Sequence, residues 1–128
     1  MLDESGYGRL TDLGIARIWN PENSQDTSGT LGYMGNSYKV NIAPEVMFRQ
    51  NHNAAADYFG VGVIGYELMM NKRPYYSKSR KDIKNDILAK QVIIKKSEIP
   101  EGWSCEAADF INKVLVLLNI LVFTKKTS

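Results

Sequence analysis

The sequence has very little of what small proteins use to bind metals or to cross-link a fold. Among its 128 residues there is one cysteine, Cys105, and one histidine, His52. A single cysteine excludes an internal disulfide and a multi-cysteine zinc site, and it is typical of a reducing compartment. We therefore expect an intracellular, cytoplasmic location. His52 has no second metal-ligand type beside it, so we expect it in a solvent-facing loop.

A long apolar run is also missing. The strongest candidate, residues 114–123, is interrupted by Asn119, whereas a helix needs about twenty apolar residues to cross a membrane. This run instead predicts a buried helix or strand near the C-terminus. Residues 1–10 are acidic and polar where a signal peptide is basic and apolar, so no cleavable signal is expected.

Neither sign of charge is in large excess. Sixteen Lys and Arg residues stand against fourteen Asp and Glu, for a formal net charge of +2, and they are scattered along the chain. Proteins that bind nucleic acids concentrate basic residues in a patch or stripe. We therefore expect no nucleic-acid partner and an ordinary globular domain.

Turn residues and apolar spacing predict a mainly α fold with one small β-hairpin at the N-terminus. The hairpin is expected over residues 1–12, around the turn signal Glu4-Ser5-Gly6. Residues 15–42 keep neither a helical nor a strand period, which indicates a long loop, and loops of that length are usually functional. Helices are predicted over 44–49 behind Pro44, over 54–70, after the capping box of Ser79 and Asp82, and from about Ser104.

The helix predicted over 54–70 has apolar residues around its whole circumference, which favours a central, buried position. Residues 60–65 within it spell Gly-Val-Gly-Val-Ile-Gly, the letters of a dinucleotide-binding motif. That motif must follow a strand and open a helix, and here helix is predicted on both sides. We therefore expect these glycines to permit close packing of a neighbouring element.

The last two helices are predicted from their apolar faces. The first of these faces consists of Ile83, Ile87 and Leu88, and the second of Ala107, Phe110, Ile111, Val114 and Leu115. Trp19, Trp103, Met69 and Met70 are expected to pack in the interior. Cys105 has no histidine partner in the sequence and is not expected to be a nucleophile.

Four motifs follow one another in a defined order. They are Leu10-Thr11-Asp12-Leu13-Gly14-Ile15-Ala16-Arg17, Gly29-Thr30-Leu31-Gly32-Tyr33-Met34, Ala43-Pro44-Glu45-Val46 and Asp57-Tyr58-Phe59-Gly60-Val61-Gly62-Val63. Together with Arg73-Pro74-Tyr75, this series resembles the C-terminal lobe of eukaryotic protein kinases. The serine/threonine branch fits better, in particular the AGC group with its cyclic-nucleotide-dependent members.

The resemblance implies the domain organisation. Residues 1–113 are expected to form a C-terminal lobe fragment of the α+β protein-kinase fold, with the activation segment at 12–45 and a divergent tail at 114–128. Residues 35–42 stand out as an apparent insertion, because in the family the positions of Met34 and Ala43 are directly connected.

The resemblance also implies roles for individual residues. Asp12 matches the aspartate that binds magnesium at the nucleotide phosphates, so ATP and Mg²⁺ are the implied cofactors. Thr30 matches the threonine that hydrogen-bonds the catalytic aspartate, and Thr30, Leu31, Gly32 and Tyr33 match the wall that receives the substrate. Glu67 matches a position that binds a substrate arginine, which implies a protein substrate with basic residues near the target serine or threonine.

Further positions are matched as structural or regulatory. The structural ones are Gly14, Ala43, Pro44, Glu45, Asp57 and Gly62; of these, Glu45 pairs in the family with a late arginine, and Asp57 clamps the catalytic-loop backbone. Asp26 falls where related kinases carry an activating phosphothreonine, and Arg17 is its expected partner. Thr27 and Ser28 are the alternative phosphorylation sites.

Several departures from the family accompany this match. The glycine-rich loop, the nucleotide-binding lysine and the catalytic-loop aspartate and asparagine would all precede Met1, and no arginine follows Arg80 to pair with Glu45. We therefore expect this chain neither to transfer phosphate nor to bind ATP and Mg²⁺ by itself. Three interpretations stay open: an inactive fragment of a serine/threonine kinase or pseudokinase, a non-catalytic module that binds partners below helices 54–70 and 80–91, and a truncated gene product.

Overall fold

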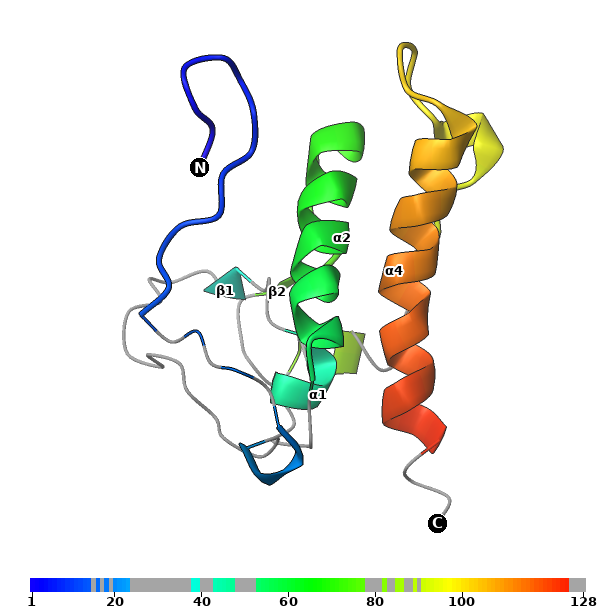
Figure 1. The fold of residues 1–128 in the computed structure, drawn as a ribbon. Coiled ribbons are helices and arrows are strands. Elements are labelled where there is room, and N and C mark those ends of the chain that lie inside the picture. Colours follow the sequence, from blue (N-terminus) through cyan, green and yellow to red (C-terminus); the bar gives the residue numbers. More distant parts are fainter. Residues whose placement is uncertain are drawn as a thin grey trace.

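Two long helices, α2 and α4, lie side by side, with α4 on the side of α2 away from the N-terminal segment (Figure 1). The computed structural model describes residues 1–14, 16, 18, 20–23, 38–39, 43–47, 53–77, 82, 85–86, 89 and 91–124. The elements are the 3₁₀ helix η1 (Pro21–Asn23), β1 (Tyr38–Lys39), α1 (Pro44–Met47), α2 (Ala55–Met70), β2 (Tyr76–Ser77), the 3₁₀ helix η2 (Lys96–Glu98) and α4 (Cys105–Thr124). The described part of the chain is thus mostly helical, as predicted.

Local signals set both ends of α2. Asn53 Oδ1 accepts a hydrogen bond from the Ala55 N–H at 2.9 Å, which satisfies one of the donors that the first helical turn leaves free. Asn71, directly after the helix, has a φ of 50°, and this left-handed conformation ends helices. The helix predicted over 54–70 is therefore confirmed.

One face of α2 is buried, not its whole circumference. Tyr58 and Leu68 are 61% and 68% exposed, and Val61 and Ile64 are about half exposed. The prediction of a central, buried helix therefore holds for one face of α2 and not for the exposed one. Because apolar residues occupy every face, their spacing could not tell which face a neighbour would cover. The buried residues are Phe59, Gly62, Val63, Tyr66 and Met69.

The helix α4 begins where the sequence predicts it. Ser104 Oγ accepts a hydrogen bond from the Ala107 N–H at 3.1 Å, which is the geometry of an N-terminal cap. Ile111 is buried as predicted. Phe110 is 51% exposed, so the prediction that Phe110 belongs to the apolar face of this helix is wrong. Neighbouring helical positions point about 100° apart, and α4 turns Ile111 toward α2. Trp103 is 40% exposed and does not pack in the interior as predicted.

The apolar run over 114–123 lies inside α4, which confirms a helix at this place. Leu115, within the run, is among the most buried side chains of the protein. Among the described residues, no helix has the length and apolar character needed to cross a membrane.

The core lies where α2, α4, the start of α1 and the segments around Tyr75 and Ile94 meet. The rings of Phe59 and Tyr75 stack there with centroids 6.2 Å apart, and α1 packs against α4. The short helix predicted behind Pro44 begins at that residue, while its last predicted positions, 48–49, lie outside the described residues. The core residues are Ala43, Phe59, Val63, Tyr66, Met69, Tyr75, Ile94, Ala108, Ile111 and Leu115.

Asn112 on α4 joins this helix to the segment 91–95. The Ile94 N–H donates to Asn112 Oδ1 at 2.7 Å, and Asn112 Nδ2 donates to the Ile94 carbonyl oxygen at 2.9 Å. One side-chain amide thus satisfies both backbone groups of a buried residue, which would otherwise be costly to leave unpaired. In the following η2, the Lys95 N–H donates to Glu98 Oε2 at 3.0 Å.

The described two-stranded sheet joins distant parts of the chain. β1 pairs antiparallel with β2, with Tyr38 opposite Ser77 and Lys39 opposite Tyr76. β1 belongs to the apparent insertion at 35–42. This part of the insertion is therefore paired with the chain immediately after Tyr75.

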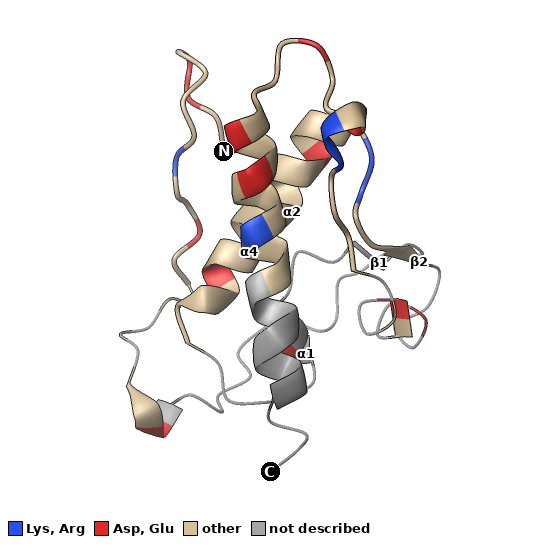
Figure 2. Cartoon of the chain, turned by 90° about the vertical axis from the view of Figure 1, so that its right-hand side faces the viewer, with Lys and Arg blue, Asp and Glu red and all other residues tan. Residues whose placement is uncertain are grey.

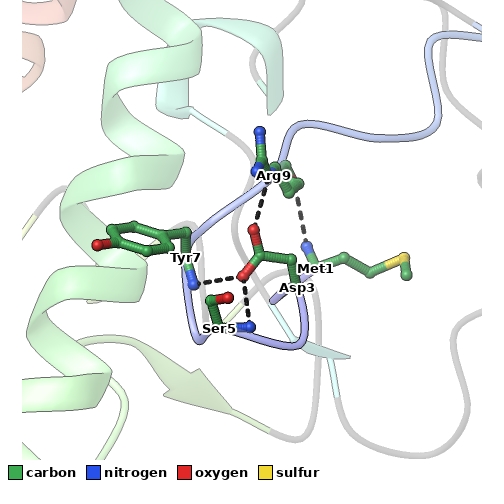
Figure 3. A network of polar contacts seen from close by, with 5 residues as sticks. All are labelled: Met1, Asp3, Ser5, Tyr7 and Arg9. Carbon is green, nitrogen blue, oxygen red and sulfur yellow. Dashed lines mark hydrogen bonds and ion pairs between the residues drawn. The ribbon is translucent and has the colours of Figure 1, made fainter.

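The N-terminus forms a turn, and the predicted β-hairpin is not seen there. Over residues 1–14 the structure describes one antiparallel bridge, between Leu2 and Gly8, and no strand. The Asp3 carboxylate accepts hydrogen bonds from the Ser5 N–H at 3.0 Å, the Tyr7 N–H at 2.8 Å and Arg9 Nε at 2.8 Å (Figure 3). The bond from Tyr7, followed by that from Arg9, lowers the pKa of Asp3 below its usual value. The Asp3 N–H also donates to the Tyr7 carbonyl oxygen at 2.9 Å and the Arg9 N–H to that of Met1 at 2.8 Å, so the two sides of the turn pair over a few residues only.

Several predictions fall on residues outside the described part of the chain. Asp82, Asn85, Asp86 and Ala89 have helical conformation, but most of the third predicted helix, including Ser79, Ile83, Ile87 and Leu88, is not described. The same holds for Trp19, His52 and the loop residues 24–37.

Candidate functional site

Most of the predicted substrate and regulatory residues lie outside the described residues. These are Arg17, Asp26, Thr27, Ser28, Thr30, Leu31, Gly32 and Tyr33. The geometry of the candidate site therefore comes from Asp12 and Gly14 on the N-terminal segment, from Glu45 on α1, and from Asp57, Gly62 and Glu67 on α2.

Asp12 has an unusual backbone conformation. Its φ is 61°, in the left-handed region that costs an L-residue other than glycine about 1–3 kcal/mol. Aspartate tolerates this region better than most residues, and such conformations cluster at functional positions. A Cβ built on Gly14 would lie 3.6 Å from Asp12 Oδ1, an ordinary contact, so a glycine is not required there to make room for the carboxylate. The neighbouring Leu13 is exposed.

The carboxylate of Asp12 fits a magnesium ion as one ligand of a larger set. Its side chain is exposed, and proteins commonly hold Mg²⁺ through one or two carboxylates together with phosphates and water. The described residues contain no group of three or more His, Cys, Asp or Glu side chains that could hold a metal by themselves. Asp12 therefore needs ligands from a nucleotide or from other residues.

Glu45, unlike the exposed Asp12, is a buried carboxylate. It lies in the first turn of α1 and is buried, with 7% of its surface exposed, next to the buried Ala43. An acidic group in a first turn is favoured by the helix dipole. The structural role that the resemblance implies for Ala43, Pro44 and Glu45 stays a prediction.

Asp57 is exposed in the first turn of α2. Its N–H donates to the Ala54 carbonyl oxygen at 3.1 Å, which closes the first turn. The helix dipole favours a carboxylate here. The contact with a catalytic-loop backbone that the resemblance implies stays a prediction.

Gly62 and Gly65 lie where α2 approaches α4. A Cβ built on Gly62 would lie 3.0 Å from Val114 Cγ1 and 3.2 Å from Leu115 Cδ2. One built on Gly65 would lie 3.1 Å from Ile111 Cγ1. Real Cβ contacts are rarely this short, so the missing side chains let the two helices come together. The motif at 60–65 is thus inside a continuous helix that packs against α4.

Glu67 lies in the last turns of α2 and forms an ion pair with a residue beyond the helix. Arg73 Nη2 and Glu67 Oε1 are 3.4 Å apart, and the two side chains are 22% and 41% exposed. Arg73 Nη1 is buried and has no acceptor among the residues that the structure describes. The sequence analysis identified Glu67 and used Arg73 only as part of a motif. The one available signal was a cation shortly after the helix end, where the helix dipole attracts it.

Acidic and basic residues are interspersed along the described elements (Figure 2). Around Glu67 and Arg73 the two signs balance in a single pair. The described part of the candidate site thus has exposed carboxylates at Asp12 and Asp57 and a paired carboxylate at Glu67.

Comparison with known families gives one extended match. A model of the protein kinase domain matches residues 1–119, a range that contains every residue of the candidate site.

Individual relatives are serine/threonine kinases. The putative ribosomal protein S6 kinase alpha-2 of Caenorhabditis elegans is 30% identical over 120 residues, which are 90% of this chain and 14% of that protein. Human ribosomal protein S6 kinase alpha-1 is 32% identical over 113 residues, which are 87% of this chain and 14% of that protein. A probable serine/threonine-protein kinase of Dictyostelium discoideum is 30% identical over 117 residues, or 90% of this chain and 23% of that protein. The chain thus spans less than a quarter of the length of these relatives.

Proposed function

Because this chain belongs to the protein kinase domain family and resembles its AGC group, we propose that it contributes the C-terminal half of a serine/threonine kinase catalytic domain. Such a domain transfers the γ-phosphoryl group of ATP to a serine or threonine of a protein. The observation that carries this proposal is the kinase match over residues 1–119, which runs from the turn at Asp3 into α4.

In the complete domain, Asp12 is proposed to be one ligand of a magnesium ion. When bound, magnesium neutralises charge on the transferring phosphoryl group. The carboxylate is exposed and therefore open to such a ligand set. The packed helices α2 and α4 supply the rigid support that positioning requires.

The activation segment, which is described only in part, is proposed to carry substrate binding and regulation. Thr30, Leu31, Gly32 and Tyr33 form the substrate wall in this proposal. Asp26 acts as a fixed charge near Arg17, in place of the activating phosphothreonine that related kinases carry at this position. Thr27 and Ser28 are the alternative phosphorylation sites. A carboxylate has one charge and two oxygens, against nearly two charges and three oxygens of a phosphate, so its effect is the weaker one.

The isolated chain is proposed to be inactive. Nothing in it matches a general base or a lysine for the phosphates, and kinase catalysis consists almost entirely of positioning and charge stabilisation. Incubation with magnesium and radiolabelled ATP should therefore give no transfer to a basic peptide above the rate without protein.

A graft tests the active role. Residues 1–119 replace the matched segment of human ribosomal protein S6 kinase alpha-1, and phosphorylation of a serine peptide is measured. We expect a turnover that Asp12→Asn lowers by roughly a hundredfold to a thousandfold, the usual effect of removing one electrostatic group from an active site. Asp109→Asn, on the exposed side of α4, is the matched control. A folded graft without activity, or equal turnover with Asp12→Asn, contradicts the proposal.

A second candidate function, a non-catalytic interaction module, is favoured by the exposed apolar face of α2. Tyr58, Val61, Ile64 and Leu68 form this face, and apolar faces of this kind mark interaction sites. Val61→Glu combined with Leu68→Glu separates the two roles. If the face packs inside a complete kinase domain, the double variant inactivates the graft. If the graft keeps its turnover, the face is free for another protein.

A further inference from the structure

The ion pair between Glu67 and Arg73 changes what Glu67 offers to a substrate. The Glu67 carboxylate is 41% exposed, and a guanidinium of the same chain lies against it at 3.4 Å. A carboxylate that is already paired attracts a second cation less strongly, because the two charges largely cancel at a distance. An incoming basic side chain has to compete with Arg73 for the same oxygen.

The backbone on both sides of Arg73 holds this residue near Glu67. Asn71, with its φ of 50°, turns the chain sharply at the end of α2. Two residues beyond Arg73, Tyr75 is 2% exposed and stacks on Phe59. Arg73 is thus held between a fixed turn and a buried aromatic anchor, and its side chain lies back along the last turns of the helix.

The burial of Arg73 also limits how far it can move aside. Its side chain is 22% exposed and Nη1 is buried without an acceptor among the described residues. Breaking the pair would leave a second part of this guanidinium without a partner, and an unpaired, partly buried cation is costly. The ion pair is therefore more persistent than one between two fully exposed side chains.

We propose that Arg73 is a specificity-determining residue that occupies Glu67 from within the chain and lowers its preference for a basic residue of the substrate. This inference rests on the proposed function, since it concerns how the kinase chain selects its peptide. Under this inference the chain prefers a basic residue in its substrate only weakly, and Arg73 sets the strength of that preference.

Peptide binding to the full 128-residue chain tests this inference. Two fluorescent serine peptides, one with a single arginine and one with alanine in its place, are titrated at low salt and followed by anisotropy. The measured quantity is the ratio of their dissociation constants. Arg73→Ala should raise the preference for the arginine peptide by roughly twofold to fivefold, the range that exposed ion pairs are worth. Arg73→Gln, which keeps most of the side-chain stem, should do the same.

Two further variants make the test specific. Lys72→Ala removes a neighbouring positive charge and should leave the preference unchanged. Glu67→Gln in the Arg73→Ala background should abolish the gain, because the gain needs the carboxylate.

Each remaining outcome counts against the inference. If the ratio of dissociation constants is the same in every variant, Arg73 has no role in peptide selection and only stabilises the C-terminal end of α2. Peptides that bind no variant show that Glu67 is not a peptide site in this chain. In both cases the kinase proposal is judged separately, by phosphate transfer in the graft.

Discussion

At the scale of single residues, Gly62 shows how little space separates α2 from α4. Gly62→Ala adds a methyl group 3.0 Å from Val114 Cγ1 and 3.2 Å from Leu115 Cδ2. Alanine favours the helix by about 1 kcal/mol, but overpacking costs about 1–3 kcal/mol, and the buried Leu115 has no room to move. We expect a lower free energy of unfolding in urea. Val114→Ala in the same chain should restore part of it by removing the closest contact, and simple additivity of the two changes would contradict this account.

Tyr66 makes the stability of the protein sensitive to alkaline pH. Burial, and then the nearby charge of Glu98, raises the pKa of Tyr66 above its usual value of 10.0. In the unfolded chain the phenol loses its proton near pH 10, while the folded chain still holds it. The contribution to stability is therefore complete below that pH and is lost as the pH rises through the folded-state pKa.

Tyr66→Phe should remove the part of the loss of stability at alkaline pH that comes from ionisation of this phenol. The measurement is the free energy of unfolding in urea between pH 8 and about 11. Tyr58→Phe, an exposed tyrosine of the same helix, is the control and should keep the loss. Parallel pH curves for wild-type protein and Tyr66→Phe would contradict the assignment.

At the scale of elements, Asn112 holds the segment 91–95 against α4. Asn112→Asp keeps an acceptor for the Ile94 N–H but loses the donor to the Ile94 carbonyl oxygen. Leaving that part-buried carbonyl unpaired should cost about 1–3 kcal/mol of unfolding free energy. Amide hydrogen exchange at Ile94 and Lys95 should become faster, because local opening becomes easier.

An exposed pair on the same helix is the control for Asn112. Lys113 Nζ and Asp109 Oδ2 are 2.6 Å apart on the surface of α4. Such pairs are worth about 0–1 kcal/mol, so Asp109→Asn should change the unfolding free energy little. If Asn112→Asp and Asp109→Asn lower the unfolding free energy by the same amount, the hydrogen bonds of Asn112 do not hold the segment 91–95 against α4.

At the scale of the whole molecule, the insertion at 35–42 connects the activation segment to the chain beyond α2. Its residues Tyr38 and Lys39 pair with Tyr76 and Ser77. A two-residue ladder adds little stability, but it ties the insertion to the chain after Tyr75. We propose that this connection shifts the substrate wall that the kinase resemblance implies. A displacement of about 1 Å in a positioning element can cost on the order of a hundredfold in rate.

Deletion of residues 35–42 in the kinase graft should therefore raise turnover by about tenfold or more, since it restores a direct connection between Met34 and Ala43. Turnover on one serine peptide, with and without the deletion, is the measurement. The unfolding midpoint should change little, because loop-closure entropy varies only with the logarithm of loop length. Equal turnover would mean that the insertion does not disturb the wall.

Features that depend on neighbouring residues could be predicted from the sequence. Pro44, Ser104 and the polar residues after Met70 mark helix ends through local hydrogen bonds and backbone preferences, and the observed helices begin or end at these residues. The order of the kinase motifs is equally a property of the sequence, and the family match over 1–119 agrees with it. The predicted N-terminal hairpin is not shown, because the two sides of the turn pair only through one bridge and the backbone hydrogen bonds from Asp3 to Tyr7 and from Arg9 to Met1.

Features that depend on a distant partner were settled only by packing. α2 is apolar on every side, so the sequence does not indicate which face is buried. The buried face is the one on which Gly62 and Gly65 pack against α4. Phe110 and Ile111 are adjacent in sequence, yet only Ile111 is turned inward. β1 pairs with β2, and Arg73 pairs with Glu67 across a left-handed turn at Asn71. In each case apolar spacing or charge was compatible with several partners, and the choice among them was made by the shape and position of a second element.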